Sequence, residues 1–131
     1  MIGNVDSLIC FNKELKENYG FYRLFKDCTG IKDASEFTLS AEILTNNCYE
    51  SMFEGCTSLT EAPKLPAEIL ASSCYANMFK DCTSLTSAPA LPAKTLAEFC
   101  YANMFNGCTS LIQTPALPAT TLASNCYQGM F

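Results

Sequence analysis

A tandem repeat of 26 residues fills most of this 131-residue chain and constrains its fold more than any other feature. Near-identical units begin at Met52, Met78 and Met104, and the segment 24–51 is the same unit with two extra residues. A unit of this length cannot bury its apolar side chains alone, so tandem copies stack and share one core. We therefore divide the chain into a degenerate N-terminal capping half-coil at 1–23, repeats at 24–51, 52–77, 78–103 and 104–129, and the start of a further unit at 130–131.

The composition favours a folded chain and argues against several classes of function. Apolar residues make up 49% of the chain and charged residues 16%, a balance typical of a chain that buries a core. The net charge of −5, without a basic cluster, argues against nucleic acid as a partner. No apolar run is long enough to cross a bilayer, and the first residues lack the features of a signal peptide, so we expect no membrane insertion. Histidine is absent, and we expect no metal, no cofactor and no enzymatic activity.

The charges are concentrated near the N-terminus. Of the 21 charged residues, 13 lie in 1–50 and none lies in 99–131. Terminal repeats need a polar outer face because nothing stacks on them. We therefore expect a capped N-terminal end and an uncapped C-terminal end. The uncapped end implies either an excerpt of a longer array or an end that is covered by another chain.

Each unit combines two hydrophobic patterns. In the return arm, apolar residues recur at spacings of three and one, which predicts an amphipathic helix. Pro66 suits the first position of that helix, and the Asp or Gly residues at 27, 55, 81 and 107 suit its left-handed end. Before Pro63 only a short strand fits, around 59–62. The patterns predict an α/β solenoid with short parallel strands on a concave face and short helical return arms, α or 3₁₀.

The pattern C-x-x-L-x-x-A-P-x-L-P…M-F-x-x-C resembles the leucine-rich repeats of BspA-like bacterial surface proteins, here in a 26-residue variant with Cys-Tyr and Met-Phe pairs. The resemblance covers residues 24–131. It departs from the shorter family form at Ala62, Ala88 and Thr114, where a larger aliphatic residue is usual, and by an extra residue before Leu65. The resemblance implies a leucine-rich-repeat fold, adhesion or host contact, and a location at the cell surface or outside the cell.

Cysteine recurs in two columns, one residue of each column per repeat. The columns are Cys48, Cys74, Cys100 and Cys126, and Cys28, Cys56, Cys82 and Cys108, with Cys10 outside both. A disulfide ladder, a metal site and a nucleophile are the functional alternatives. Spacings of 8 and 18 residues do not fit a zinc motif, and equivalent positions on helical arms would lie too far apart for disulfides. We expect reduced, buried thiols that pack as small apolar groups.

Aromatic residues form two further columns that also favour a structural role over a binding platform. They are Phe25, Phe53, Phe79, Phe105 and Phe131, and Tyr49, Tyr75, Tyr101 and Tyr127. The apolar stripe places the phenylalanines inward, and we expect stacked ladders along the core.

Positions that vary between repeats indicate a surface, because a stacked core demands sameness and a binding face does not. Nine such positions flank the predicted strand: Thr60, Glu61, Lys64, Thr86, Ser87, Ala90, Ile112, Gln113 and Ala116. We expect them on the concave face, in contact with a ligand, although neutral drift on a solvated surface explains the variation equally well. A further variable set comprises the pairs at 68–69, 94–95 and 120–121.

These observations favour a non-enzymatic binding or adhesion module that presents its surface to a protein or glycan partner. The alternative is a structural subunit that self-associates end to end through the uncapped C-terminal coil. A thiol enzyme is a distant third, because no histidine is present to activate a cysteine.

Overall fold

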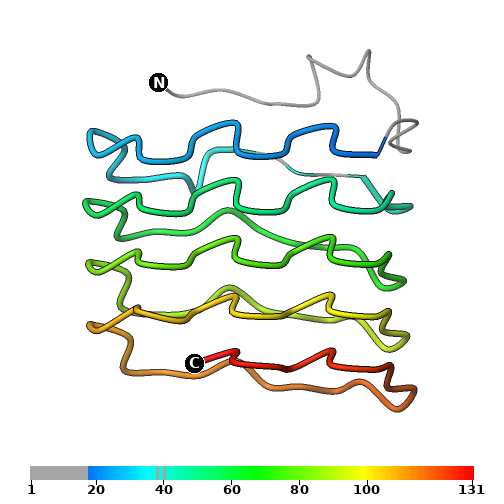
Figure 1. The fold of residues 1–131 in the computed structure, drawn as a ribbon. Helices are drawn as coiled ribbons and strands as arrows, with labels where there is room; N and C mark the ends of the chain where they lie inside the picture. Colours follow the sequence, from blue (N-terminus) through cyan, green and yellow to red (C-terminus); the bar gives the residue numbers. More distant parts are fainter. Residues whose placement is uncertain (1–17, 38, 40) are drawn as a thin grey trace.

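The computed structural model describes residues 18–37, 39 and 41–131, which wind into flattened coils stacked one above another (Figure 1). One wall consists of consecutive turns, and we call it the turn ladder; its segments are 18–27, 46–55, 72–81, 98–107 and 124–129. The opposite wall is extended, and we call it the bridge wall; its segments are 31–45 (without 38 and 40), 59–71, 85–97 and 111–123. In Figure 1 the coils follow one another down the stack with little sideways shift, and the segments predicted to form a concave face make up the bridge wall.

The turn ladder divides its backbone N–H groups between two uses. Every second N–H closes a turn within its own coil, as Met78 N–H does to Tyr75 O at 3.1 Å. The alternate N–H groups donate to the next coil, as Tyr75 does to Cys100 O at 3.0 Å and Phe79 to Met104 O at 3.0 Å. Each coil is therefore held internally by turns and externally by a parallel row of hydrogen bonds.

The predicted helical return arms are wrong, because no helix occurs in the described ranges. Every fourth residue of the turn ladder has a positive φ, as in Ser73 (54°), Asn77 (56°) and Asp81 (60°). A left-handed residue at each fourth position breaks the i to i−4 hydrogen bonds that an α-helix requires. The left-handed conformation predicted for residues 27, 55, 81 and 107 is present, but these residues end a row of turns rather than a helix.

The predicted strand around 59–62 is also wrong, and with it the leucine-rich-repeat fold of parallel strands and helices. The bridge wall contains isolated parallel bridges, which join Asp33 to Glu61, Ile43 to Ile69, Ile69 to Thr95, Ser87 to Gln113 and Thr95 to Thr121. From 59 onwards its segments carry two prolines each, at the positions of Pro63 and Pro66. Proline has no N–H to donate to a neighbouring strand, so pairing is limited to single residues on either side of the prolines.

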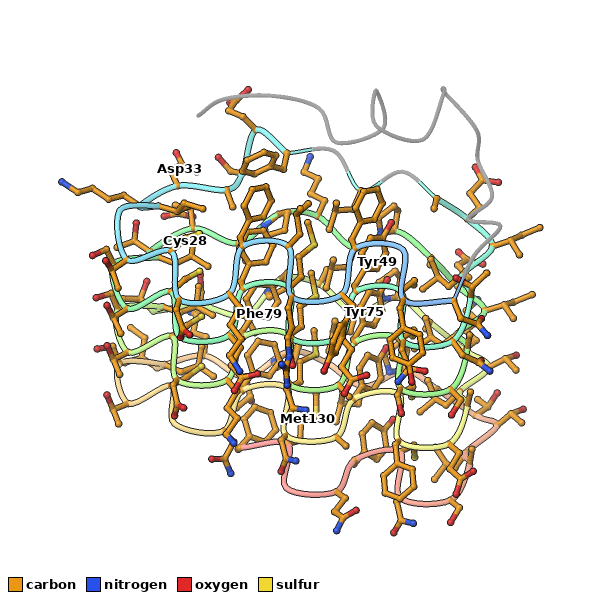
Figure 2. All side chains as sticks on the ribbon, turned by 45° about the horizontal axis from the view of Figure 1, so that its top comes forward. Cys28, Asp33, Tyr49, Tyr75, Phe79 and Met130 are labelled. Atoms are coloured by element: carbon orange, nitrogen blue, oxygen red, sulfur yellow. The ribbon has the colours of Figure 1, made fainter. Side chains whose placement is uncertain are left out.

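Two stacked aromatic ladders fill the space between the walls. Phe21, Tyr49, Tyr75, Tyr101 and Tyr127 form one ladder, with ring centroids 5.8–6.0 Å apart and interplanar angles of 5–8°. The other runs through Phe25, Phe53, Phe79, Phe105 and Phe131 at 5.5–5.8 Å. The predicted inward stacking is confirmed. Figure 2 shows Tyr49 and Tyr75 in successive coils between the two walls.

The cysteine columns complete the core. Cys48, Cys74 and Cys100 have no exposed surface, and Cys126 is 5% exposed. In the second column the thiols of Cys56, Cys82 and Cys108 donate to the carbonyl oxygens of Phe25, Phe53 and Phe79 at 3.0–3.1 Å. The eight described cysteines are free thiols. The chain is therefore a repeat protein with a buried cysteine ladder and stacked aromatic ladders.

The predicted boundaries of the repeats and of the cap stay predictions. Most of the expected capping half-coil at 1–23, together with Cys10, lies outside the described residues. Within the described part, residues 18–27 donate hydrogen bonds to 46–55 in the same way as each later segment of the turn ladder does to its neighbour.

Candidate functional site

The nine variable residues predicted to bind a ligand all lie on the bridge wall. They are Thr60, Glu61, Lys64, Thr86, Ser87, Ala90, Ile112, Gln113 and Ala116, and all except the half-buried Ser87 are exposed. The inward side chains of the same segments, such as Leu65 (3% exposed) and Leu91 (3%), are buried in the core. The wall thus separates invariant inward positions from variable outward ones.

The structure brings members of this set together in successive coils. A parallel bridge pairs Ser87 with Gln113, and Ile112 N–H donates to Thr86 O at 3.0 Å. Between the second and third repeats, Leu70 N–H donates to Thr95 O at 3.2 Å, and beside the wall the Ser84 hydroxyl donates to Thr57 O at 2.6 Å. The wall therefore presents its variable side chains on a backbone that is tied between coils.

The repeat pattern did not reveal that the first repeat also contributes to this surface. Lys32 O accepts hydrogen bonds from Thr60 N–H (2.8 Å) and Thr60 Oγ1 (2.9 Å), and Asp33 bridges to Glu61. The two extra residues of that repeat hide the correspondence, since the spacing is 28 rather than 26. Figure 2 labels Asp33 at the edge of the first coil.

Asp33 is held in a local hydrogen-bonded turn. The Ser35 hydroxyl and the Ser35 N–H both donate to Asp33 Oδ1, at 2.6 and 2.8 Å. These hydrogen bonds stabilise the carboxylate and lower the pKa of Asp33 below its usual range. The surface therefore carries a fixed negative charge at this edge.

A proline-lined groove adjoins the variable residues between the second and third repeats. Its volume is about 380 Å³, and its lining residues are Ala62, Pro63, Lys64, Leu65, Pro66, Pro89, Ala90 and Pro92. Two of these residues belong to the predicted set. At the equivalent position in the two repeats the groove is lined by the short side chain of Ala90 and the long side chain of Lys64. The prolines give it an apolar surface with few N–H donors.

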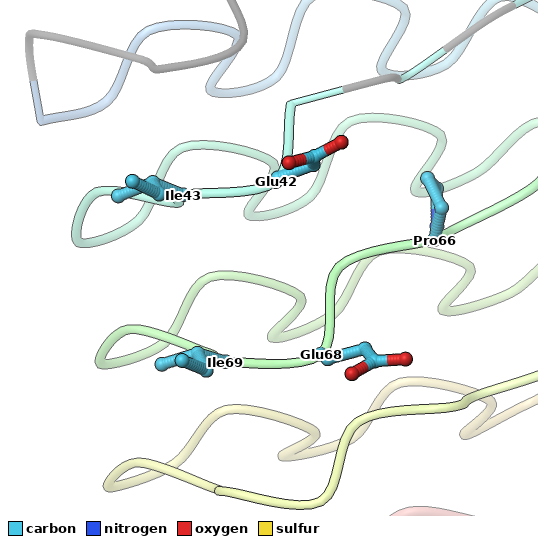
Figure 3. A pocket seen from close by; sticks show the side chains of 5 residues that line it. All are labelled: Glu42, Ile43, Pro66, Glu68 and Ile69. Carbon is cyan, nitrogen blue, oxygen red and sulfur yellow. The ribbon is translucent and has the colours of Figure 1, made fainter.

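A second, larger hollow lies toward the other end of the same wall (Figure 3). Its volume is about 670 Å³, and we call it the Glu-Ile hollow; Glu42, Ile43, Pro66, Glu68 and Ile69 line it. Pro66 is shared with the proline groove. Residues 68–69 vary between repeats, but the sequence pattern alone predicted no function for them.

The thiols are in environments that suppress their reactivity. Burial raises the pKa of Cys48 to about 12 and that of Cys56 and Cys100 to about 11, so these groups remain protonated at neutral pH. Among the residues that the structure describes, no three acidic, cysteine or histidine side chains are grouped in a way that could hold a metal ion. Within the same part of the chain, no helix is long and apolar enough to cross a membrane.

No protein-family model, no curated protein and no solved structure matches this chain. The arrangement of its own residues is therefore the basis for assigning a function.

Proposed function

We propose that this chain is a non-enzymatic binding module that presents its bridge wall to a protein or glycan partner. The observation that supports this proposal is a contrast within each repeat. Core positions keep the same residue from coil to coil, as in the Phe ladder and, after Phe21, the Tyr ladder, whereas the outward positions of the bridge wall change in size and charge. A fixed core with a variable exposed face is the organisation by which repeat proteins build extended binding surfaces.

The geometry of the wall supports recognition rather than chemistry. The variable side chains stand on a backbone tied by inter-coil hydrogen bonds, so little order has to be imposed when a partner binds. The adjoining proline groove offers apolar surface beside the charge of Lys64. The resemblance of the repeat pattern to BspA-like proteins favours adhesion at a cell surface as the setting, and it rests on the sequence pattern rather than on a strand-and-helix fold.

A selection experiment tests the proposal. The wild-type chain is screened against a random 12-residue peptide library and against a glycan array. A variant with Thr86→Arg and Gln113→Arg is screened in parallel, because both side chains are exposed on the bridge wall. The control places a bulky charge on the turn ladder instead, at the exposed position of Gln128 (Gln128→Arg).

We expect ligands that bind the wild type and the control but lose binding to the double variant. Equal binding to all three proteins would mean that the bridge wall is not the binding face. No selected ligand in either library would contradict the proposal of a binding module.

A self-associating structural subunit is the second candidate, and exposed apolar side chains of the last coil favour it. Leu117 is 40% exposed and Leu122 is 61% exposed, whereas the equivalent Leu91 and Leu96 are 3% and 6% exposed. An exposed face of this kind is a site for association with another surface. Sedimentation velocity across a concentration series tests this candidate.

A further inference from the structure

The Glu-Ile hollow combines two exposed isoleucines with two glutamates on adjacent coils. In Figure 3 Ile43 lies above Ile69 and Glu42 above Glu68, so the same dipeptide is repeated in register. The hollow is separate from the nine variable residues on which the proposed binding face rests. An inference about it can therefore hold or fail independently of that proposal.

The apolar side of the hollow is unusual for a solvent-facing surface. Ile43 is 56% exposed and Ile69 is 65% exposed, although both belong to a residue type that is usually buried. A parallel bridge joins the two residues, which places their side chains about 4.8 Å apart on the same side of the wall. The pair forms a short, rigid apolar strip rather than two scattered side chains.

The charged side of the hollow offers the carboxylate of Glu68, which forms no ion pair with the described residues. Among the described residues, no basic group lies within ion-pair distance of Glu68. The nearest coil places Lys94 next to it in the column, but the contact is through the backbone, from Lys94 N–H to Glu68 O at 3.1 Å. The Glu68 side chain is exposed and can accept hydrogen bonds from a partner.

We propose that the Glu-Ile hollow docks an arginine side chain from an extended segment of a partner protein. The aliphatic stem of arginine would lie along Ile43 and Ile69, and its guanidinium would reach Glu68 at the rim. Arginine suits this combination because its methylene groups cover apolar surface while its planar, permanently charged end pairs with carboxylates. The carboxylate of Glu68 favours a positively charged group, and the two isoleucines favour one that is carried on an apolar stem.

The chain contains its own comparison for this proposal. In the third repeat the equivalent positions hold Lys94 and Thr95, and a parallel bridge joins Thr95 to Ile69 as another joins Ile69 to Ile43. Replacing Glu68 and Ile69 by Lys and Thr therefore transfers a pair that the fold already accepts. The reverse transfer, Lys94→Glu with Thr95→Ile, extends the hollow by one coil.

A methyl NMR titration with two peptides tests the proposal. The probe is acetyl-Gly-Ala-Arg-Ala-Gly-amide, and the control peptide carries citrulline, which has the same shape without the charge. We expect shifts at the methyl groups of Ile43 and Ile69 with the arginine peptide, and none at Ile31 or Ile112. Shifts at Ile112 instead would place the peptide on the variable face and overturn the docking site, while leaving the proposed function standing.

Variants of the hollow then separate the contribution of the carboxylate to peptide binding from that of the isoleucines. Glu68→Gln should weaken binding by about two- to fivefold, the range that corresponds to an exposed ion pair. The control Glu98→Gln, an exposed glutamate of the turn ladder, should leave it unchanged. The transfer of Lys and Thr to 68–69 should abolish the shifts, and the reverse transfer at 94–95 should tighten binding. Equal binding of the arginine and citrulline peptides, or no binding of either, would overturn the proposal.

Discussion

Aspartate and glycine alternate from coil to coil at one edge of the turn ladder. The column reads Asp27, Gly55, Asp81 and Gly107, and all four residues have φ between 60° and 80°. A Cβ at Gly55 would overlap Asp27 Oδ1, and a Cβ at Gly107 would overlap Asp81 Oδ1. Each aspartate therefore folds over the glycine of the next coil, and a side chain at the glycine position would displace the aspartate carboxylate.

This alternation of aspartate and glycine predicts that Gly107→Ala lowers the free energy of unfolding. The new Cβ meets Asp81 Oδ1 and the left-handed backbone is itself unfavourable for alanine, so we expect a loss of roughly 1–3 kcal/mol in the free energy of unfolding. Gly30→Ala is the control, because nothing lies within 4 Å of its Cβ position. Urea unfolding of both variants measures the difference, and equal losses would contradict the steric explanation.

The buried thiols predict a loss of stability at alkaline pH. Burial raises the pKa of Cys48 from its ordinary 9.0 to about 12, so between these values the unfolded chain loses a proton that the folded chain keeps. The free energy that this pKa difference contributes is fully present below pH 9. It decreases as the pH rises toward 12, by up to about 1.4 kcal/mol per pH unit for this thiol.

Urea unfolding between pH 8 and 11 measures this dependence. Cys48→Ala removes one of the titrating groups and should reduce the slope of stability against pH, whatever its effect on stability at pH 8. A free energy of unfolding that stays constant from pH 8 to 11 would show that the thiols ionise as readily in the folded chain as in the unfolded one.

At the scale of the element, the apolar pattern of the return arm has a period of four rather than 3.6. Cys74, Tyr75, Met78, Phe79 and Cys82 follow one another at spacings of one and three, which fits an amphipathic helix over two turns. The same spacing fits a row of four-residue turns in which each fourth residue is left-handed. Ser73 and Asn77 mark those positions, and polar residues that tolerate positive φ at every fourth place were the available signal.

Two aromatic residues of the turn ladder, Tyr19 and Phe99, depart from this chemistry. Phe99 has φ of 56°, whereas the equivalent positions in the coils before and after it hold Ser73 and Asn125. A bulky residue in the left-handed region is unfavourable, and asparagine tolerates it. We expect Phe99→Asn to raise the free energy of unfolding by about 0.5–1 kcal/mol.

Phe99→Ala is the matched control for this prediction. Alanine removes the same ring but keeps a Cβ and has no side chain amide to bond the local backbone, so the strain should remain. Thermal unfolding of both variants shows whether the backbone strain at Phe99 or the packing of its ring has the larger effect on stability. A destabilised Phe99→Asn variant would mean that the half-buried ring contributes more than its backbone conformation costs.

The outward surface followed from the sequence only in part. Variation between repeats identified the exposed positions of the bridge wall, such as Thr86 and Gln113, because side chains outside the core are free to change. The proline groove and the Glu-Ile hollow did not follow, since a hollow depends on how neighbouring coils align. That alignment is set by single bridges such as Ile43 to Ile69, which no pattern within one repeat reveals.

Across the whole molecule, the backbone hydrogen bonds between successive turn-ladder segments all point the same way along the stack. Each turn-ladder segment donates its free N–H groups toward the next coil and accepts from the previous one. In the last coil, Tyr127 and Gly129 occupy positions whose equivalents donate in every earlier coil. If two copies faced each other through this end, the N–H groups of one copy would face the N–H groups of the other. Such a pair would bury apolar side chains but could not form the row of hydrogen bonds that joins successive coils.

This one-way hydrogen bonding predicts only weak self-association of the 131-residue chain when it is expressed as printed. Leu122 and Phe131 are 61% and 55% exposed, and their burial is the available driving force. We expect the mean mass in sedimentation velocity to rise between about 10 and 500 µM, and Leu122→Lys to return it to that of a monomer. Leu96→Lys, at the buried equivalent position, should instead unfold the chain, because an unpaired charge cannot be accommodated in the core. A mean mass that is independent of concentration would rule out this face as a site of self-association and remove the structural-subunit candidate.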